Sequence, residues 1–149
     1  MMFRGSSSHT IDPKGRFIIP ARFRDVIKGT GQDLIMITRM DGCLYAYVMD
    51  EWTKVENNIL DLPQKNDAMR RFQRIFIGSC QECKCDTQGR VLIPPALKDY
   101  AGLEKEIVLV GVINRFEIWS KEKWDQENGQ MDIDLGDDQV RQEIAQLRL

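Results

Sequence analysis

Short apolar runs, each ended by a turn signal, are the main pattern along the chain. They occupy residues 17–19, 34–38, 44–48, 91–93, 107–112 and 116–119. Runs of this length next to Gly, Pro, Asp or Asn are typical of short strands. Asp41-Gly42 lies between two of the runs and is a strong hairpin signal. Asn114-Arg115 stands between the last two runs, so we expect two β-hairpins and two shorter buried strands.

Helical periodicity fills the segment between the hairpins. The apolar faces consist of Trp52, Val55 and Ile59 in a first helix and of Met69, Phe72 and Phe76 in a second. Asp50 is the expected N-cap of the first helix, and Pro63 is its expected stop. Asn66 or Asp67 should cap the second helix. We therefore expect a two-helix connector in the middle of the chain.

The C-terminal part of the chain is polar and carries weaker signals. Ser120 is the expected start of a helix that contains Trp124. Residues 127–136 are polar and interrupted by glycine, which predicts a loop. Asp137 or Asp138 should cap a final helix. Its apolar stripe consists of Val140, Ile144 and Leu147. A helix this short needs a partner surface.

One segment of the chain occurs twice. DPKGRFIIPARFRDVI at 12–27 matches DTQGRVLIPPALKDYA at 86–101, and 86 − 12 gives an offset of 74 residues. The identical positions are Asp12/Asp86, Gly15/Gly89, Arg16/Arg90, Ile19/Ile93, Pro20/Pro94 and Asp25/Asp99. An internal match at this spacing predicts a duplicated structural unit.

Each copy has the sequence of a turn, a short strand and a short helix. The turn-forming residues are Asp12, Gly15, Asp86 and Gly89. The aspartate can accept backbone N–H groups, and the glycine supplies a positive φ. The apolar run that follows predicts a strand buried on both faces, and the proline after it suits the first turn of a helix. Gly29 and Gly102 stand where the helix C-caps are expected.

Composition places the chain among ordinary folded domains. It has 149 residues, of which 42% are hydrophobic and 30% charged, enough for one domain or for two small halves with a common core. No apolar segment approaches the ~20 residues that a membrane span requires. The first ten residues lack the apolar core of a signal peptide. We therefore expect a cytoplasmic protein whose four cysteines are thiols.

Charge is distributed unevenly although the net charge is only −2. Residues 1–30 carry six basic and two acidic residues, a balance of +4. Residues 125–149 carry seven acidic and two basic residues, a balance of −5. A basic head and an acidic tail suit contacts with phosphate groups or between subunits.

Residues for catalysis are sparse, and a metal site is only an alternative. The single histidine, His9, lies in a polar segment, and the chain has no nucleophile motif or phosphate-binding loop. We therefore expect neither an enzyme nor a cofactor. A CxxCxC cluster is formed by Cys80, Cys83 and Cys85. It could hold zinc if Cys43 or His9 supplied a fourth ligand. The other interpretation is a strand with buried thiols that leads to Asp86.

The two turns are the best candidate for binding nucleic acid. Arg16 and Arg90 follow the turn glycines at identical places, where a guanidinium could form a fork with a phosphate or a guanine edge. Further basic residues of the first copy are Lys14, Arg22 and Arg24. The alternative is that Asp12 pairs with Arg16 and only locks the turn. The second copy has Gln88 and Ala96 in place of two of these basic residues, so the turns need not bind equally.

These motifs resemble the bacterial MraZ family. The resemblance rests on FRG at 3–5, the two blocks described above, RRFQRIFIGS at 70–79 and AGLEKEIVLVGVINRFEIW at 101–119. It implies an α+β, mostly β fold, a tandem AbrB-like (SpoVT/AbrB) swapped-hairpin barrel in which two pseudo-repeats interlock within one chain. We expect the first repeat with its following helix at 1–60, a helical connector at 61–79, and the second repeat with a C-terminal helical tail at 80–149. The CxxCxC cluster departs from this pattern.

The resemblance also implies a function. MraZ proteins are sequence-specific transcription regulators, usually repressors, of a division and cell-wall gene cluster, and they bind double-stranded DNA at direct repeats upstream of their own gene. Family members form rings of about eight or more subunits, associate with the nucleoid and need no cofactor. The family's DNA-contacting arginine corresponds to Arg16 and, by the repeat, to Arg90. Arg4 also matches the family pattern, and Lys14, Arg22 and Arg24 would contact phosphates. The alternative is a ring scaffold that binds no DNA.

Overall fold

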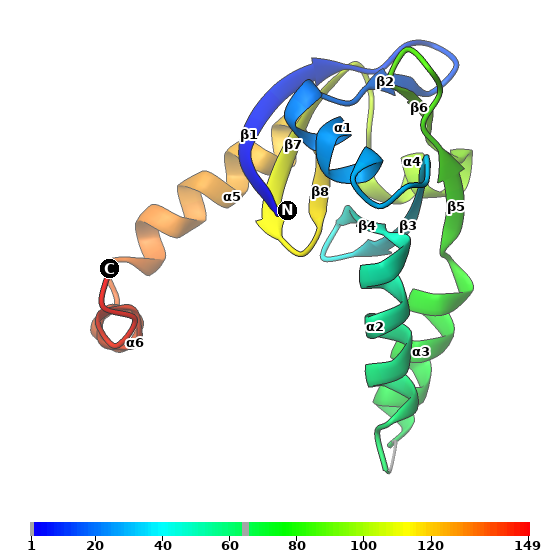
Figure 1. Ribbon diagram of the computed structural model, residues 1–149. Coiled ribbons are helices and arrows are strands. Elements are labelled where there is room, and N and C mark those ends of the chain that lie inside the picture. The colour runs from blue at the N-terminus through cyan, green and yellow to red at the C-terminus, as the bar shows by residue number, and fades with distance from the viewer. Residues whose placement is uncertain (1, 64–65) are drawn as a thin grey trace.

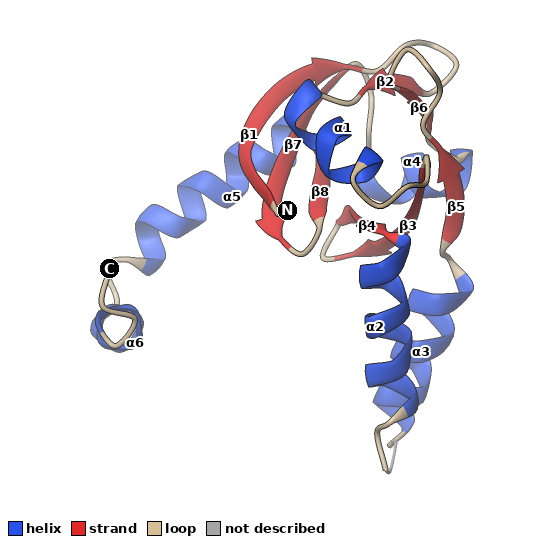
Figure 2. Ribbon diagram, viewed as in Figure 1, coloured by secondary structure: helices blue, strands red, loops and turns tan. Residues whose placement is uncertain are grey.

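The computed structural model describes residues 2–63 and 66–149, which form eight strands and six helices (Figures 1 and 2). The strands are β1 (Phe3–Thr10), β2 (Arg16–Ile18), β3 (Leu34–Met40), β4 (Cys43–Val48), β5 (Gln81–Lys84), β6 (Arg90–Leu92), β7 (Glu106–Ile113) and β8 (Phe116–Ser120). The helices are α1 (Ala21–Lys28), α2 (Met49–Leu60), α3 (Asp67–Gly78), α4 (Pro95–Ala101), α5 (Lys121–Asp134) and α6 (Asp138–Ala145). The predicted α+β class is confirmed.

Strand pairing interlocks the two copies. A six-stranded sheet has the order β1-β7-β8-β4-β3-β5, and β2 pairs with β6 in a separate two-stranded ribbon. The pairs β1–β7, β3–β5, β4–β8 and β2–β6 each join a strand before residue 61 to a strand after residue 80. Only the two predicted hairpins, β3–β4 and β7–β8, pair within one copy. This exchange of strands is the expected tandem swapped-hairpin arrangement.

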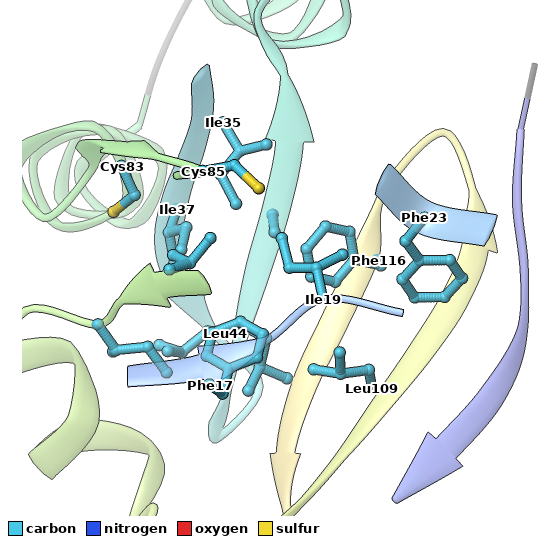
Figure 3. Close-up of a cluster of buried hydrophobic side chains, with 14 of the residues drawn as sticks. Phe17, Ile19, Phe23, Ile35, Ile37, Leu44, Cys83, Cys85, Leu109 and Phe116 are labelled. Carbon is cyan, nitrogen blue, oxygen red and sulfur yellow. The ribbon is translucent and has the colours of Figure 1, made fainter. Parts of the chain in front are cut away.

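The main core is shared by both copies, as Figure 3 shows for part of it. Phe17 and Ile19 from the first copy pack in the same cluster as Leu109 and Phe116 from the second, each at most 2% exposed. The ring of Phe3 also meets the rings of Phe23 and Phe116 at centroid distances of 5.2 and 5.1 Å. Because this core buries residues of both copies, the two copies fold around it together. The predicted boundaries at 60 and 79 stay a prediction.

The helical connector forms a second, smaller core on the sheet. Trp52 of α2 and Phe76 of α3 stack at a centroid distance of 5.6 Å, and Tyr47 of β4 packs against Trp52 at 5.5 Å. Figure 1 shows α2 and α3 side by side, extending away from the sheet. The predicted apolar faces of both helices therefore pack on each other and on the strands.

Helix boundaries confirm some of the predicted caps and correct others. Asn66 accepts a hydrogen bond from the N–H of Met69, and Ser120 and Asp137 cap α5 and α6 in the same way. The prediction for Asp50 is wrong, because the helix starts at Met49 and Asp50 lies in its first turn. There its carboxylate complements the helix dipole without capping a backbone N–H.

The predicted loop at 127–136 is also wrong, since α5 continues to Asp134. Gly129 remains helical, and a glycine in a helix costs only about 1 kcal/mol relative to alanine. The Ser120 cap and side-chain bonds one turn apart, such as Gln130 to Asp134 at 2.9 Å, offset that cost.

The C-terminal helices extend away from the sheet. Figure 1 shows α5 running from the end of β8 away from the sheet, and α6 well separated from α2 and α3. None of the α5 and α6 residues is buried. Within the described part of the chain, no helix is both long and apolar enough to cross a bilayer.

Candidate nucleic-acid interface

The first turn is built by the carboxylate of Asp12. Its Oδ1 accepts the backbone N–H groups of Lys14 and Arg16, both at 2.9 Å. Its Oδ2 accepts Nε–H of the Arg16 guanidinium at 2.8 Å. Gly15 adopts φ +88°, a conformation that favours glycine. The short segment between Asp12 and Arg16 therefore fixes both the backbone and the arginine side chain.

The second turn repeats this geometry. Oδ1 of Asp86 accepts the N–H groups of Gln88 and Arg90 at 2.9 and 2.8 Å, and Oδ2 accepts Nε–H of Arg90 at 2.9 Å. Gly89 adopts φ +79°. Matching bonds of the two turns differ by no more than 0.1 Å.

Hydrogen bonds keep both turn carboxylates charged. The backbone N–H of Arg16 is the largest cause that lowers the pKa of Asp12 below its ordinary value, and the Arg16 side chain adds to it. The backbone and side chain of Arg90 lower the pKa of Asp86 in the same order. Each arginine is thus held by a carboxylate that is ionised at neutral pH.

The aspartate–arginine pair does not consume the guanidinium. Arg16 and Arg90 use Nε for the pair, and their side chains remain 37% and 38% exposed. In residues 2–63 and 66–149, no hydrogen bond engages the terminal nitrogens of either arginine. The two interpretations from sequence are therefore compatible, because the pair locks the turn and also aims the free fork of the guanidinium.

The β2–β6 ribbon brings the two turns together. Phe17 pairs with Val91 at its centre, which places Arg16 opposite Leu92 and Ile18 opposite Arg90. Backbone bonds of 2.9 Å also run from each copy to the turn glycine of the other. Arg16, Ile18 and Arg90 line one hollow of about 170 Å³. Arginines that are 74 residues apart in sequence thus share one face.

The other predicted contacts divide into two groups. Lys14 lies in the first turn, and Arg24 of α1 covers the second, since a Cβ on Gly89 would lie 2.6 Å from Cδ of Arg24. Arg22 instead donates from Nε to the carbonyl oxygen of Arg4 at 3.3 Å. Arg4 lies at the start of β1, whereas the ribbon follows its other end. The ribbon face therefore includes Lys14 and Arg24, and Arg4 and Arg22 form a separate basic group.

Sequence analysis missed two residues of the ribbon face. The runs at 17–19 and 91–93 were expected to be buried throughout, yet Ile18 and Leu92 are each 54% exposed. The expectation is wrong for these two residues because a two-stranded ribbon has one face against the core and one free face. Their position two residues after Arg16 and Arg90 was the available signal, since alternate strand residues share a face.

The cysteine cluster is built into the packing of the chain. Cys83 and Cys85 lie in the main core (Figure 3), whereas Cys80 packs at the smaller core beside α2 and α3. Burial raises the pKa of Cys83 to about 11, which disfavours the thiolate that a metal needs. Among the described residues, no three His, Cys, Asp or Glu side chains converge as metal ligands. The geometry thus supports the strand interpretation of this segment.

His9 has a hydrogen-bonding role in its strand. Its Nε2 lies 2.7 Å from Oγ of Ser7. Partial burial, followed by the nearby charge of Arg22, lowers the pKa of His9. His9 is therefore a half-buried residue of the edge strand β1, bonded to a neighbour in the same strand.

Comparisons with known proteins agree with this architecture. The family model described as "MraZ protein, putative antitoxin-like" matches twice, at residues 2–75 and 76–141. "Transcriptional regulator MraZ" of Desulforapulum autotrophicum is 56% identical over 148 residues, 99% of this chain and 100% of the relative. The protein of the same name from Desulfosudis oleivorans is 50% identical over the same share of both chains. That from Clostridium beijerinckii is 49% identical over 85% of this chain and 87% of its own. The chain therefore belongs to the MraZ family, whose members compared here are named transcriptional regulators.

Proposed function

We propose that this chain regulates transcription by binding double-stranded DNA in a sequence-specific manner. The observation that carries the proposal is the ribbon face, on which the terminal nitrogens of two carboxylate-locked arginines have no hydrogen-bond partner among the described residues. The major groove of B-DNA admits a two-stranded ribbon, and arginine forms a fork with O6 and N7 of guanine. Arg16 and Arg90 would read base edges in this way. The phosphate contacts would come from Arg4, Lys14, Arg22 and Arg24.

The proposed target lies upstream of the chain's own gene. We infer that the target is a set of direct repeats ahead of a division and cell-wall gene cluster, and that the bound protein represses that cluster by covering its promoter. The support is the family membership, together with relatives named as transcriptional regulators. Such a protein would act in the cytoplasm, at the nucleoid, without cofactor or catalytic activity.

Self-association is the second part of the proposal. We infer a ring of about eight or more copies, held by one repeated head-to-tail contact. The apolar stripe of α6 supplies one side of it, since Val140 and Ile144 are only half-buried and Leu147 is 67% exposed. An apolar groove of about 360 Å³ supplies the other side. Its walls include Tyr45, Tyr47, Val55, Met69 and Phe72.

The position of the groove indicates which chain can fill it. The groove lies between α2 and α3, far from the α6 of the same chain in Figure 1, so a neighbouring copy is the occupant that can reach it. A head-to-tail contact joins two different surfaces of identical chains. It forms a ring when the rotation that relates each chain to the next closes after a whole number of chains.

A variant pair tests the α6 contact. Ile144→Asp places a charge in the stripe, whereas the control Gln142→Asp adds the same charge on the opposite side of the helix. Light scattering of the purified proteins should show a smaller particle for the first variant and the parental particle for the second. Equal masses for all three proteins would exclude α6 from the assembly.

Repetition would make weak contacts selective. One ribbon offers two arginine forks, too few for tight binding, but neighbouring copies in a ring present the same face again. Direct repeats about one helical turn (~10 bp) apart could engage neighbouring copies on one side of the duplex. Linking such contacts raises affinity by about 10²–10⁴ without any new type of contact.

A binding titration tests the proposed function. We expect the full chain to shift the fluorescence anisotropy of labelled DNA from upstream of its own gene at lower protein concentration than a shuffled duplex of equal composition. Binding should weaken steeply between 50 and 200 mM salt, as phosphate contacts require even for a chain of net charge −2. Equal affinity for both duplexes would contradict sequence-specific binding. No binding at low salt would favour the ring scaffold.

A further inference from the structure

Two apolar side chains stand on the ribbon face between the arginines. Ile18 and Leu92 are each 54% exposed and occupy matching positions in β2 and β6. Single exposed apolar residues are common on protein surfaces. These two, however, are related by the internal repeat, and each lies directly across the ribbon from a guanidinium. The turns therefore present two arginine–aliphatic pairs, Arg16 with Leu92 and Arg90 with Ile18.

The chemistry of the major groove gives such a pair a specific use. Guanine presents O6 and N7, which suit the arginine fork, and thymine presents a C5 methyl group, which suits an aliphatic side chain. A methyl contact distinguishes thymine from the other three bases without a hydrogen bond. An exposed Ile or Leu beside a locked arginine can therefore recognise a base that the arginine does not.

Distances within the ribbon match the spacing of bases. Residues opposite each other on paired strands have Cβ atoms about 4.5–5.5 Å apart. Successive bases along one strand of DNA rise by about 3.4 Å. The arginine and the aliphatic side chain of one pair can therefore reach the same or an adjacent base step. Because β2 and β6 are antiparallel, the second pair has the opposite orientation to the first.

We propose that Ile18 and Leu92 determine sequence specificity by contacting thymine methyl groups in the major groove, next to guanines held by Arg90 and Arg16. This inference rests on the proposed DNA-binding function. It adds Ile18 and Leu92 as residues that contact bases and thymine as a base that they recognise. Each arginine–aliphatic pair would contact one guanine and one neighbouring thymine. The two pairs would read this step in opposite directions, because β2 and β6 are antiparallel.

Removing the thymine methyl groups tests the inference directly. The DNA upstream of the chain's own gene is synthesised once with dTTP and once with dUTP, and both duplexes are titrated with the full-length protein. Losing the burial of one methyl group weakens binding by about four-fold. The two contacts of one ribbon together predict about fifteen-fold weaker binding of the uracil duplex, and more if several copies bind at once.

Protein variants separate a direct contact from an effect on DNA shape. Ile18→Ser/Leu92→Ser should bind the thymine duplex about as weakly as the parent binds the uracil duplex, and should no longer distinguish the two. The control is Ile113→Ser, because Ile113 is 58% exposed but lies opposite Phe3, at the other end of β1 from the ribbon. This control should keep the full preference of the parent for thymine.

Each outcome decides the inference. A parent that binds both duplexes equally, but above a shuffled duplex, would overturn the thymine contact and leave the DNA-binding proposal standing. A double variant that keeps the parent's preference would show that uracil acts through DNA shape, and would also overturn it. A smaller particle in light scattering of the double variant would make the two side chains a contact between copies instead. A parent that binds no duplex would refute the proposed function itself.

Discussion

Replacing Arg16 with alanine is the perturbation that the geometry of the first turn makes most informative. Arg16 contributes its Nε to the pair with Asp12, and no residue in the described part of the chain engages its terminal nitrogens, which can therefore form a fork. A fork on guanine is worth about 1–3 kcal/mol of discrimination, which corresponds to about 5- to 150-fold in affinity. If two copies engage two repeats, the losses add to about 2–6 kcal/mol.

Folding should survive this change. The Arg16 side chain is 37% exposed, and half-exposed ion pairs contribute little to stability. The melting temperature of Arg16→Ala should therefore stay within a few degrees of that of the parent, and its particle size should be unchanged. Arg16→Lys keeps the charge but loses the fork, so its affinity should fall between those of the parent and the alanine variant.

The assay is a titration of upstream DNA at fixed salt with the parent and four variants. Arg90→Ala measures the second turn, and Lys54→Ala is the control, because Lys54 is also ion-paired but lies on α2 away from the ribbon. We expect both arginine variants to lose affinity for upstream DNA far more than for a shuffled duplex. Parental affinity of folded Arg16→Ala would refute the assignment of the first turn to base contact.

Further predictions concern the turns and the core. Gly89→Ala should destabilise the fold more than Gly31→Ala in chemical denaturation. Both glycines have φ +79°, so both variants carry the same backbone strain. A Cβ on Gly89 would also displace Arg24, whereas nothing lies within 4 Å of a Cβ on Gly31. In the double variant Asp12→Asn/Asp86→Asn, the stability of the fold should depend less on pH below about pH 4. The lowered pKa values of both carboxyl groups give stability that is present above the unfolded-state pKa and lost as pH falls through the folded-state pKa. An unchanged slope of stability against pH would contradict this. Burial raises the pKa of Cys83 to about 11 in the folded chain, so about one Cys83 thiol in a thousand is ionised at pH 8. Cys83 should therefore react with an aromatic disulfide at pH 8 much more slowly in the folded than in the unfolded chain. Equal rates would show that the core opens.

The elements of the fold were predictable because local signals agree with the final packing. Asp41 and Gly42 both take positive φ in the β3–β4 hairpin, as the sequence pair suggests. The turns at Asp12 and Asp86 likewise depend on side chains within five residues. The pairing of β1 with β7 could not be derived from either copy, because β1 is polar apart from Phe3 and carries no alternating apolar pattern. The resemblance to a family implied that the two halves interlock, but not that β1 pairs with β7.

Failures of prediction arose where an element lacks a buried face. Helix α5 has no buried residue, so periodicity gave no sign of it beyond Trp124, and the polar sequence around Gly129 resembled a loop. The opposite error occurred at Ile18 and Leu92, where aliphatic residues were assigned to the core. A hydrophobic side chain favours burial, but its hydrophobicity does not show which face of a ribbon is buried. The free face depends on the position of the ribbon at the edge of the core.

Methylation of guanine N7 by dimethyl sulfate is the most direct test of the claim that the ribbon reads the major groove. On DNA from upstream of the gene, the parent protein should protect guanines at N7 in clusters about one helical turn (~10 bp) apart. The Arg16→Ala variant, at a concentration that saturates the same DNA, should leave part of each cluster reactive. Saturating parent protein that leaves every guanine N7 reactive would contradict the claim.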